Sequence, residues 1–384
     1  MSAFVGSLIC LTLLCSSSYA FQNRGISSRA KTVDIKMPLG ISETIWLNRI
    51  PADNPMSSRK VALGRTLYFD KRLSIDGTVS CATCHDPALA FTDSNPVAIG
   101  AAARRGARNT PTLLNSVFSQ LLFWDGRASS LEEQAKNPLM SSFEMGMSDV
   151  ELLRSRVSAI PEYQEAFTQV FKSNGITLNT IAMAIAAYER TLLSGNSPFD
   201  RFIAGDSGAI TDSQHRGWEL FKGKAKCIEC HTYSPSQPFF SDFRFHNTGI
   251  ADTFLGGLLK PATNIEEISL TTSTHSTELS QLGRFAVTLR KQDVGAFKTP
   301  MLRDVELTSP YMHDGSLKTL IDVVQFYNRG GNPNSYLDER MQPLTLTDAE
   351  VNDVVEFMRA LTSDEVLRQC QTAVPQTRTP VPVK

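Results

Sequence analysis

The 384-residue sequence has little charge of one sign, few cysteines, no long apolar run and no clear strand signal. Its 38 Lys and Arg balance 39 Asp and Glu, and a net charge of −1 predicts neither a nucleic-acid-binding surface nor a polybasic membrane patch. The apolar run Val5–Leu14 is far shorter than the ~20 residues that a bilayer-spanning helix needs. Segments with the Val/Ile alternation of β-strands are missing as well. We therefore expect an all-α protein without a membrane span.

The N-terminus has the features of a secretory signal peptide over residues 1–20. The apolar run ends before Ser18-Tyr19-Ala20, which places small residues at the cleavage site, although no Lys or Arg precedes the run. We expect cleavage after Ala20 and export to the periplasm. Of the seven cysteines, Cys10 and Cys15 would leave with the signal, and Cys370 lies in a Gln/Thr/Pro-rich tail. No disulfide pair is predicted.

The remaining cysteines belong to two Cys-x-x-Cys-His motifs, Cys81-Ala82-Thr83-Cys84-His85 and Cys227-Ile228-Glu229-Cys230-His231. This spacing suits covalent haem, because each thiol can form a thioether with a vinyl group of the macrocycle while the adjacent His becomes the proximal iron ligand. The second motif begins 146 positions after the first. We therefore expect two covalent haem c groups in one chain.

The motifs have two other interpretations, a redox disulfide and a zinc site. A thioredoxin-like Cys-x-x-Cys follows a strand in a βαβ unit, and the sequence predicts no such strand. A single zinc ion held by all four cysteines would leave both following histidines unexplained. Covalent haem is the favoured interpretation.

Helix signals dominate the rest of the chain. In several places a Ser or Thr precedes a Glu or Gln by three residues, which is the pattern of a capping box. The pairs are Ser130 with Glu133, Ser148 with Glu151, Thr211 with Gln214, and Thr347 with Glu350. We expect another helix to begin at Ser316 and to carry Tyr327 on its apolar face.

The length fits two domains of ordinary size, one for each motif. The expected junction is 197–208, and the Thr/Ser/Gly-rich stretch 251–282 is an expected surface loop. We predict a signal peptide at 1–20, a loosely held arm at 21–45, a first cytochrome c domain at 46–205, a second at 206–362 and a flexible tail at 363–384.

Five further stretches carry a shared pattern: Phe123-Trp124-Asp125-Gly126-Arg127-Ala128, Glu144-Met145, Ser197-Pro198-Phe199-Asp200, Gly283-Arg284-Phe285-Ala286-Val287-Thr288 and Pro310-Tyr311-Met312-His313-Asp314-Gly315. With the two motifs, they resemble the bacterial di-haem cytochrome c peroxidase and MauG family over most of the chain. The resemblance implies two cytochrome-c-like helical domains, each with one covalently attached haem c.

The resemblance also implies a calcium ion near the domain interface. By position, its ligands would be the Asn109 side chain and the carbonyl groups of Thr308 and Pro310, and oxygen donors of this kind suit a hard cation. The alternative is that Asn109 is a turn residue before Pro111.

One departure from the family pattern concerns the first haem. Members that need reductive activation carry a His shortly after the first proximal His, and this His blocks the peroxide-binding iron in the oxidised enzyme. The corresponding loop, Asp93–Arg108, contains no His. The resemblance therefore implies that the first haem iron is open, or holds only water, without an activation step.

A second departure is Tyr327, fourteen residues after His313. Typical peroxidases of the family place a Met ligand to the second haem there, whereas the MauG branch has a Tyr. A phenolate oxygen stabilises higher iron oxidation states, while Met sulfur favours ferrous iron. Ligation by His231 and Tyr327 would therefore suit storage of an oxidising equivalent. The alternative is a core tyrosine on an amphipathic helix.

The resemblance assigns catalytic roles around the first haem. Glu144 would be the general acid/base that moves a proton between the peroxide oxygens, and Gln134 and Pro138 would line the same pocket. Trp124 would lie between the haems and let the two irons share oxidation. Each polar or aromatic residue also has a structural alternative: Glu144 as a loop carboxylate, Gln134 as a solvated helix residue and Trp124 as a core residue. His246 is interpreted as structural.

These features predict a MauG-like enzyme that uses hydrogen peroxide and a high-valent di-haem state to oxidise tryptophans in a precursor of methylamine dehydrogenase, which completes its tryptophan tryptophylquinone cofactor. Because a protein substrate cannot enter a haem pocket, the oxidation would proceed by electron transfer through protein. One alternative is a peroxidase that takes electrons from a small redox protein. The other is a non-enzymatic di-haem electron carrier, which requires a strong sixth ligand at both irons.

Overall fold

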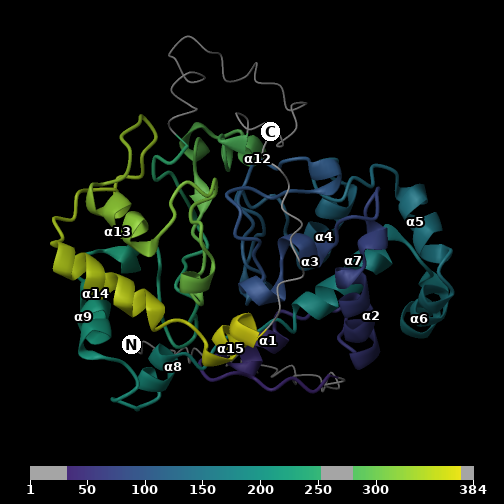
Figure 1. Cartoon of the computed structure of the whole chain (residues 1–384), viewed down its shortest axis with the longest axis horizontal. Helices are drawn as coiled ribbons and strands as arrows, with labels where there is room; N and C mark the ends of the chain where they lie inside the picture. The colour runs from purple at the N-terminus through teal and green to yellow at the C-terminus, as the bar shows by residue number, and fades with distance from the viewer. Residues whose placement is uncertain (1–32, 252–279, 373–384) are drawn as a thin grey trace, which may run out of the picture.

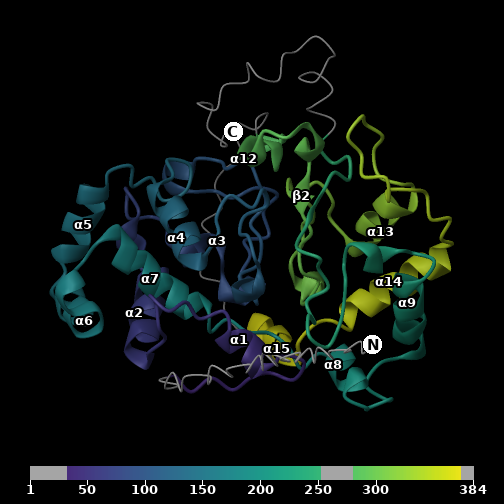
Figure 2. The same cartoon turned by 180° about the vertical axis from the view of Figure 1, so that it is seen from behind.

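The computed structural model describes residues 33–251 and 280–372. The expected signal peptide, residues 21–32 of the arm, most of the 251–282 loop and residues 373–384 of the tail lie outside the described residues. Within the described ranges the chain is helix-rich, as predicted. One two-stranded antiparallel sheet departs from the all-α expectation: β1 (Phe245–His246) pairs with β2 (Phe297–Lys298) near the middle of the molecule (Figure 2).

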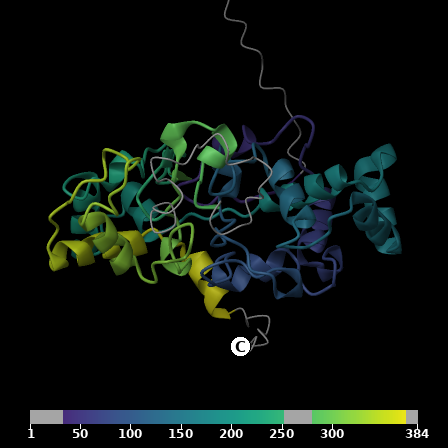
Figure 3. The ribbon, with the colours of Figure 1, turned by 90° about the horizontal axis from the view of Figure 1, so that it is seen from above.

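The helices form two lobes that lie side by side in all three views (Figure 1, Figure 2, Figure 3). The first part of the chain forms α1 (Glu43–Leu47), α2 (Ser58–Phe69), α3 (Cys81–Cys84), α4 (Leu131–Met140), α5 (Val150–Ser158), α6 (Pro161–Phe171) and α7 (Leu178–Glu189). The second part forms α8 (Pro198–Ile203), α9 (Asp212–Lys222), α12 (Phe285–Thr288), α13 (Leu320–Asn328), α14 (Asp348–Arg359) and α15 (Asp364–Thr372). Among these described helices, none has the length and apolar character needed to cross a bilayer.

Short 3-10 helices connect these elements. They are η1 (Lys71–Leu73), η2 (Pro87–Leu89), η3 (Ala101–Ala103), η4 (Ser116–Phe118), η5 (Lys172–Asn174), η6 (Cys227–Glu229), η8 (Lys291–Asp293) and η9 (Val305–Leu307). The first Cys-x-x-Cys-His motif occupies α3 and the residue after it, and the second begins in η6. Both motifs are therefore single turns between longer helices, where the thiols and the imidazole can turn toward one side.

A glycine lets two helices touch in each lobe. In the first lobe α2 packs across α7, and a Cβ atom added to Gly64 would lie 1.9 Å from the carbonyl oxygen of Ala184. In the second lobe α9 packs across α14, and a Cβ atom added to Gly217 would lie 1.9 Å from the carbonyl oxygen of Asp353. Only glycine permits such a close backbone approach. A Cys-x-x-Cys-His motif follows the first helix of each pair.

A second feature is repeated after each motif. Trp124-Asp125-Gly126 and His313-Asp314-Gly315 lie in tight loops that are each closed by an isolated antiparallel bridge. The two glycines adopt φ angles of 69° and 66°, which favour glycine. The lobes therefore repeat one structural unit. Trp124 of the first lobe corresponds to His313 of the second.

The C-terminal helix α15 joins the second lobe to the first (Figure 1). Its Val366 side chain is buried with Tyr68, Phe91 and Tyr188 of the first lobe. The flexible tail expected from residue 363 is therefore wrong for the described residues 363–372, because an apolar side chain holds this helix against the first lobe.

The N-terminal arm is also held in place where the structure describes it. Val33 and Ile41 are buried, and the indole nitrogen of Trp46 donates a hydrogen bond of 2.8 Å to the carbonyl oxygen of Arg190. The loosely held arm expected at 21–45 is therefore wrong for residues 33–45, whose apolar side chains join the core of the first lobe.

Helix α8 belongs to the second lobe. Phe199 packs against Trp218 and Phe357, and Asp200 accepts two hydrogen bonds from Arg303, of 2.7 and 2.8 Å, in an ion pair that is 2% exposed on both sides. The change of lobe therefore lies near Ser197, within the expected junction but before the domain limit expected at residue 205.

Local capping decides where several helices begin. Capping boxes form at Thr211 with Gln214 and at Thr347 with Glu350 as predicted, and Ser130 accepts a hydrogen bond from the backbone of Glu133. Helix α5 begins after Asp149 rather than Ser148, because the Asp149 carboxylate caps it. Helix α13 begins at Leu320 rather than Ser316, because Thr319 provides the cap.

Adding one methyl group at either helix crossing tests this packing. We expect Gly64→Ala and Gly217→Ala each to lower the free energy of unfolding by about 1–3 kcal/mol or more, because the added carbon meets backbone that cannot move alone. Urea unfolding is the measurement. Gly208→Ala is the control, since its added Cβ atom would meet only the Asp206 carboxylate at 3.6 Å. Equal stabilities of the three variants would contradict the close approach of the helices.

Candidate haem sites

Both Cys-x-x-Cys-His motifs line one internal cavity. Its wall includes Cys81, Cys84 and His85 from the first lobe and Cys227, Cys230 and His231 from the second. The other residues singled out from the sequence line it too: Trp124, Gln134, Pro138, Glu144, Tyr327, Asn109, Thr308 and Pro310. The fold therefore brings every predicted site residue to a single cavity between the lobes.

In both motif histidines, the Nδ1 atom lies close to a backbone carbonyl oxygen. His85 Nδ1 lies 3.1 Å from the carbonyl oxygen of Phe91, and His231 Nδ1 lies 2.9 Å from that of Phe240. A carbonyl oxygen only accepts, so Nδ1 carries the proton in each ring and the Nε2 lone pair remains for a metal. Burial lowers the pKa of both histidines, although these backbone contacts oppose the shift. Both rings are therefore neutral at neutral pH, as an iron ligand must be.

The four motif thiols form no disulfide, and they line the cavity. None of the five cysteines in the described residues forms a disulfide. Burial raises the pKa of the Cys84 and Cys227 thiols to about 12. Unpaired thiols that face an enclosed cavity beside a neutral imidazole match the requirements of thioether attachment.

Glu144 has a buried carboxyl oxygen without a partner. Among the described residues, nothing forms a hydrogen bond with its Oε2 atom. Burial raises the pKa of this carboxyl, against the opposing influence of Arg127 and a hydrogen bond with Ser141. Glu144 also acts electrostatically on the Cys81 and Cys84 thiols, so its carboxyl lies near the first motif. An unpartnered acid of this kind is able to exchange protons with a molecule in the cavity.

Helix α4 supplies the neighbouring wall. Gln134 and Pro138 face the cavity together with Leu131, Ala135 and Leu139. The spacing places these side chains on one face of the helix, and the opposite face carries the exposed residues. Gln134 is therefore a polar group in an otherwise apolar wall rather than a solvated helix residue.

The loop 93–108 folds back on itself beside Glu144. Its backbone is closed by hydrogen bonds from Gly106 to Ala98 and from Gly100 to Arg104, both 2.8 Å. It contributes four small residues, Ala98, Gly100, Gly106 and Ala107, and the larger Arg108 to the cavity wall. A Cβ atom added to Gly100 would lie 2.2 Å from the carbonyl oxygen of Phe143, so the loop lies directly on the Glu144 segment. Side chains of this size leave space in front of the first motif.

Tyr327 of α13 faces the second motif. Burial, and then the neighbouring Cys230 and Cys227 thiols, raise the pKa of its phenol. Among the residues that the structure describes, none forms a hydrogen bond with this hydroxyl. The Tyr327 side chain is half-buried and lines the cavity. The phenol is therefore available to a group held by the second motif.

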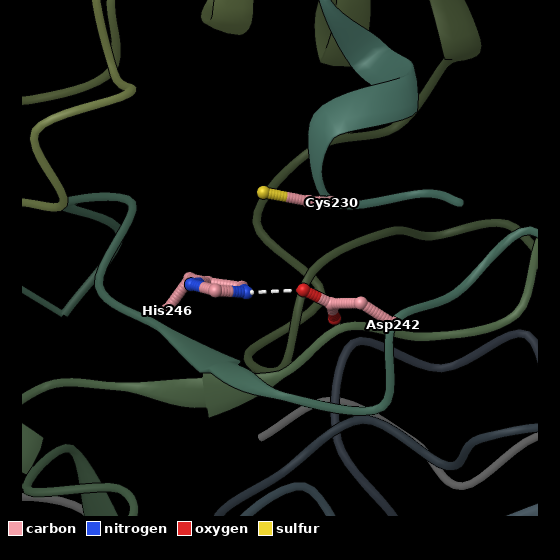
Figure 4. A group of neighbouring side chains, drawn as sticks. All are labelled: Cys230, Asp242 and His246. Atoms are coloured by element: carbon pink, nitrogen blue, oxygen red, sulfur yellow. Dashed lines mark hydrogen bonds and ion pairs between the residues drawn. The ribbon is translucent and has the colours of Figure 1, made fainter.

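A cluster that the sequence does not reveal lies beside the second motif. Figure 4 shows Cys230 near His246, whose Nε2 atom lies 2.9 Å from an Asp242 carboxylate oxygen. The Nδ1 atom lies 2.8 Å from Asp338. Burial alone would lower the pKa of His246, but the hydrogen bonds to Asp242 and Cys230 raise it to about 10. His246 thus contacts carboxylates from two segments of the chain, Asp242 and Asp338.

Trp124 lies at the contact between the lobes. Its indole nitrogen donates a hydrogen bond of 2.9 Å to the carbonyl oxygen of Asn109, and its ring meets the His313 ring edge-on at a centroid distance of 6.5 Å. His313 in turn stacks on Phe297 at 3.5 Å. Trp124 is thus held at the junction between the two motifs.

The comparisons with known proteins agree with this geometry. The model of the di-haem cytochrome c peroxidase family matches residues 58–208. A cytochrome-c peroxidase of Pseudomonas sp. (strain SCT) is 37% identical over 341 residues, which cover 87% of this chain and 88% of that protein. The chain belongs to the di-haem cytochrome c peroxidase family.

Other members of the family match as well. The methylamine utilization protein MauG of Methylophilus methylotrophus is 38% identical over 313 residues, covering 81% of this chain and 84% of that protein. The crystal structure of a MauG-like protein associated with microbial copper homeostasis has a TM-score of 0.70 at 31% identity and covers 88% of this chain and 95% of that one. As a family member, the chain is a haem-dependent oxidoreductase that acts on peroxide.

The residues of this chain fit the cofactors of the family. Two sets of unpaired thiols, two neutral histidines with a free Nε2 atom, and the unpartnered Glu144 and Tyr327 oxygens suit two haem c groups. The Asn109 amide nitrogen donates to the Asn95 carbonyl oxygen at 3.0 Å.

Glu189 is a further buried acid on the cavity wall that the sequence does not single out. Its side chain is 4% exposed, and among the described residues its Oε2 atom has no hydrogen-bond partner. Burial raises the pKa of this carboxyl to about 8, although Arg190 opposes the shift. The acid precedes Arg190 at the end of α7, where no motif marks it, and its burial follows only from the packing of α7 against α2 and α4.

We expect Glu189→Gln to change how stability depends on pH. Because the folded-state pKa lies above the ordinary 4.5, the neutral acid contributes stability that is present below pH 4.5 and lost as the pH rises through about 8. The neutral amide of the variant does not ionise. Between pH 4.5 and about 8, the free energy of unfolding of the variant should therefore rise by a few kcal/mol relative to that of the wild type, at about 1.4 kcal/mol per pKa unit. Urea unfolding at several pH values measures the gain. The control is Glu162→Gln at an exposed position of α6. A difference that does not change with pH would contradict the assignment.

Proposed function

We propose that the protein is a periplasmic di-haem c enzyme that uses hydrogen peroxide to oxidise a partner protein by electron transfer across its surface, in the manner of MauG. The observation that carries the proposal is the Glu144 Oε2 atom, which has no partner among the described residues and lies beside the first motif in a cavity shared with the second. The predicted substrate is a precursor of methylamine dehydrogenase, whose tryptophans would be converted to tryptophan tryptophylquinone.

In this proposal the first lobe holds one haem through Cys81, Cys84 and the Nε2 atom of His85. The second lobe holds the other through Cys227, Cys230, His231 and Tyr327. When bound, the haems supply the electrons that cleave the peroxide oxygen–oxygen bond and store the resulting oxidising equivalents. The chain itself positions the peroxide, moves its proton and conducts electrons to the surface.

Glu144 is the proposed acid/base. Its Oε2 atom takes the proton from one peroxide oxygen and delivers it to the other, which leaves as water. The raised pKa suits both steps, because a carboxyl that titrates closer to neutrality accepts and returns a proton more readily. Gln134 offers a hydrogen bond to peroxide in the same pocket, and Pro138 limits the motion of α4 there.

Tyr327 favours protein oxidation over the acceptance of electrons from a carrier. Bound as a phenolate, Tyr327 would stabilise oxidised states of the second iron, and the phenol would release its proton to water in the cavity on binding. Trp124 at the lobe junction would couple the two centres. Asn109, Thr308 and Pro310 would hold calcium close by and so fix the relative position of the lobes, since Asn109 also accepts the indole hydrogen bond of Trp124.

A second candidate function is a peroxidase that takes electrons from a small redox protein. The relative from Pseudomonas sp. (strain SCT), which carries the name of a cytochrome-c peroxidase, supports this alternative. A di-haem electron carrier without catalysis is the weaker alternative, because the small side chains of loop 93–108 offer no strong ligand for the first iron.

We expect Glu144→Gln to slow the reaction with peroxide by about 10²–10⁴-fold, because the amide cannot take up and return a proton. Stopped-flow absorption of the oxidised protein mixed with peroxide gives the rate. Glu132→Gln is a control on α4, as this residue is bound to Arg190 away from the motif. A Glu144→Gln rate within twofold of wild type would contradict the role of this carboxyl.

A change of Tyr327, the proposed ligand of the second haem, distinguishes oxidation of a precursor protein from oxidation of a small cytochrome. We expect Tyr327→Met to retain two haems but to lose the formation of tryptophan tryptophylquinone in a methylamine dehydrogenase precursor, because sulfur favours ferrous iron. Mass spectrometry of the precursor and turnover with a reduced small cytochrome are measured in parallel. Quinone formation by the variant would refute the role of Tyr327. Rapid turnover of the wild type with the cytochrome, without quinone formation, would favour the peroxidase.

A further inference from the structure

Lys298 is a half-buried cation at the lobe junction that the proposed mechanism does not use. It belongs to β2 in the second lobe, and its backbone nitrogen donates a hydrogen bond of 2.8 Å to the carbonyl oxygen of Trp124 in the first. Its ammonium reaches the same loop, where it donates to the carbonyl oxygen of Leu121 at 2.8 Å and lies 3.4 Å from the Ser119 hydroxyl. The side chain therefore crosses from one lobe to the other.

The Lys298 ammonium lacks an acidic partner. Among the described residues, no carboxylate lies within ion-pair distance of it, and its two hydrogen-bond acceptors are neutral. Asp125 exerts only a longer-range attraction. The Lys298 side chain also lines the cavity shared by the two motifs. Because the side chain is half-buried, water solvates this charge only in part, and an anion in the cavity would stabilise it.

The charged residues around Lys298 also favour an anion in the cavity. Asp125, which is fully buried, is already shared by Arg108 at 2.6 Å and Arg127 at 3.1 Å. Arg284 donates only to the backbone carbonyl oxygens of Asp125 and Gly126. Lys298 therefore lies near a carboxylate whose ion pairs are already made with two arginines. Burial lowers the pKa of Lys298 to about 8, which shows the cost of leaving this charge uncompensated.

Because the two lobes repeat one structural unit, the position of Lys298 in the second lobe has an equivalent position in the first lobe. Lys298-Thr299-Pro300 precedes the His313 loop as Asn109-Thr110-Pro111 precedes the Trp124 loop, with thirteen residues from the proline to the ring in each lobe. The prolines contact the two motif histidines, His231 and His85, through their backbone. At the equivalent position, one lobe therefore offers an amide and the other an ammonium, both next to a motif histidine.

We propose that Lys298 forms an ion pair with a propionate carboxylate of a haem bound in this cavity, and that the pair spans the junction between the lobes. The propionates are the anionic groups that the proposed haems bring into the cavity, and Lys298 is a cation of the cavity wall that has no acidic partner among the described residues but is anchored by hydrogen bonds to the other lobe. Lys298 is thus a positioning residue that fixes the haem edge and, as a positive charge in the cavity wall, raises the midpoint potential of that haem. This inference rests on the proposed haem sites.

The test uses the haem-loaded protein and measures both midpoint potentials by spectroelectrochemistry after haem content is counted. We expect Lys298→Gln, which can still donate to Leu121, to retain two haems and to shift one potential to more negative values. Lys298→Arg should keep the wild-type potentials because it keeps the charge. Lys291→Met, an exposed change in the same lobe, is the control and should shift neither potential.

Two haems with unmoved potentials in Lys298→Gln would overturn the inference while leaving the proposed function intact. A wild-type protein without covalent haem would contradict the proposed function itself. If the neutral variant does not fold, a crystal structure of the haem-loaded wild type decides. An Nζ atom within about 2.7–3.2 Å of a propionate oxygen supports the inference, and an Nζ atom bound only to Leu121 and Ser119 overturns it.

Discussion

The hydrogen bond from each motif histidine to a backbone carbonyl oxygen is the interaction on which the rest of the site depends. It fixes the tautomer, so that Nε2 of His85 and of His231 faces the cavity without a proton. The carbonyl groups of Phe91 and Phe240 come from loops that the two helix crossings hold in place.

The repeat of one unit explains how two similar sites can differ in chemistry. Both lobes share the glycine crossing, the motif and the tight loop after it. They differ in the groups added around the cavity: an acid and small residues beside the first motif, and a phenol and the His246 cluster beside the second. The differences lie on α4, α13 and the loops, whereas the shared features lie on α2, α7, α9 and α14. The scaffold therefore tolerates a change of chemistry in one lobe without a change in the other.

The sequence was sufficient for the groups whose meaning lies in local spacing. The two motifs, the helix-rich fold and the caps at Thr211 and Thr347 follow from neighbouring residues, and resemblance added Glu144, Gln134, Pro138, Trp124 and Tyr327, which the fold brings to one cavity. Their catalytic and ligand roles stay predictions. The packing of α15, the held arm, the buried Glu189 and the half-buried Lys298 could not be predicted, because burial depends on contacts between segments that are distant in sequence and no local pattern marks them.

Electron paramagnetic resonance of the oxidised, haem-loaded protein tests most directly whether the two iron centres are unequal. An open site at the iron of His85 and a phenolate at the iron of His231 predict one high-spin ferric signal and one low-spin ferric signal in equal amounts. Two low-spin signals, with no high-spin component, would show a strong ligand at both irons and would contradict the peroxide-activating function.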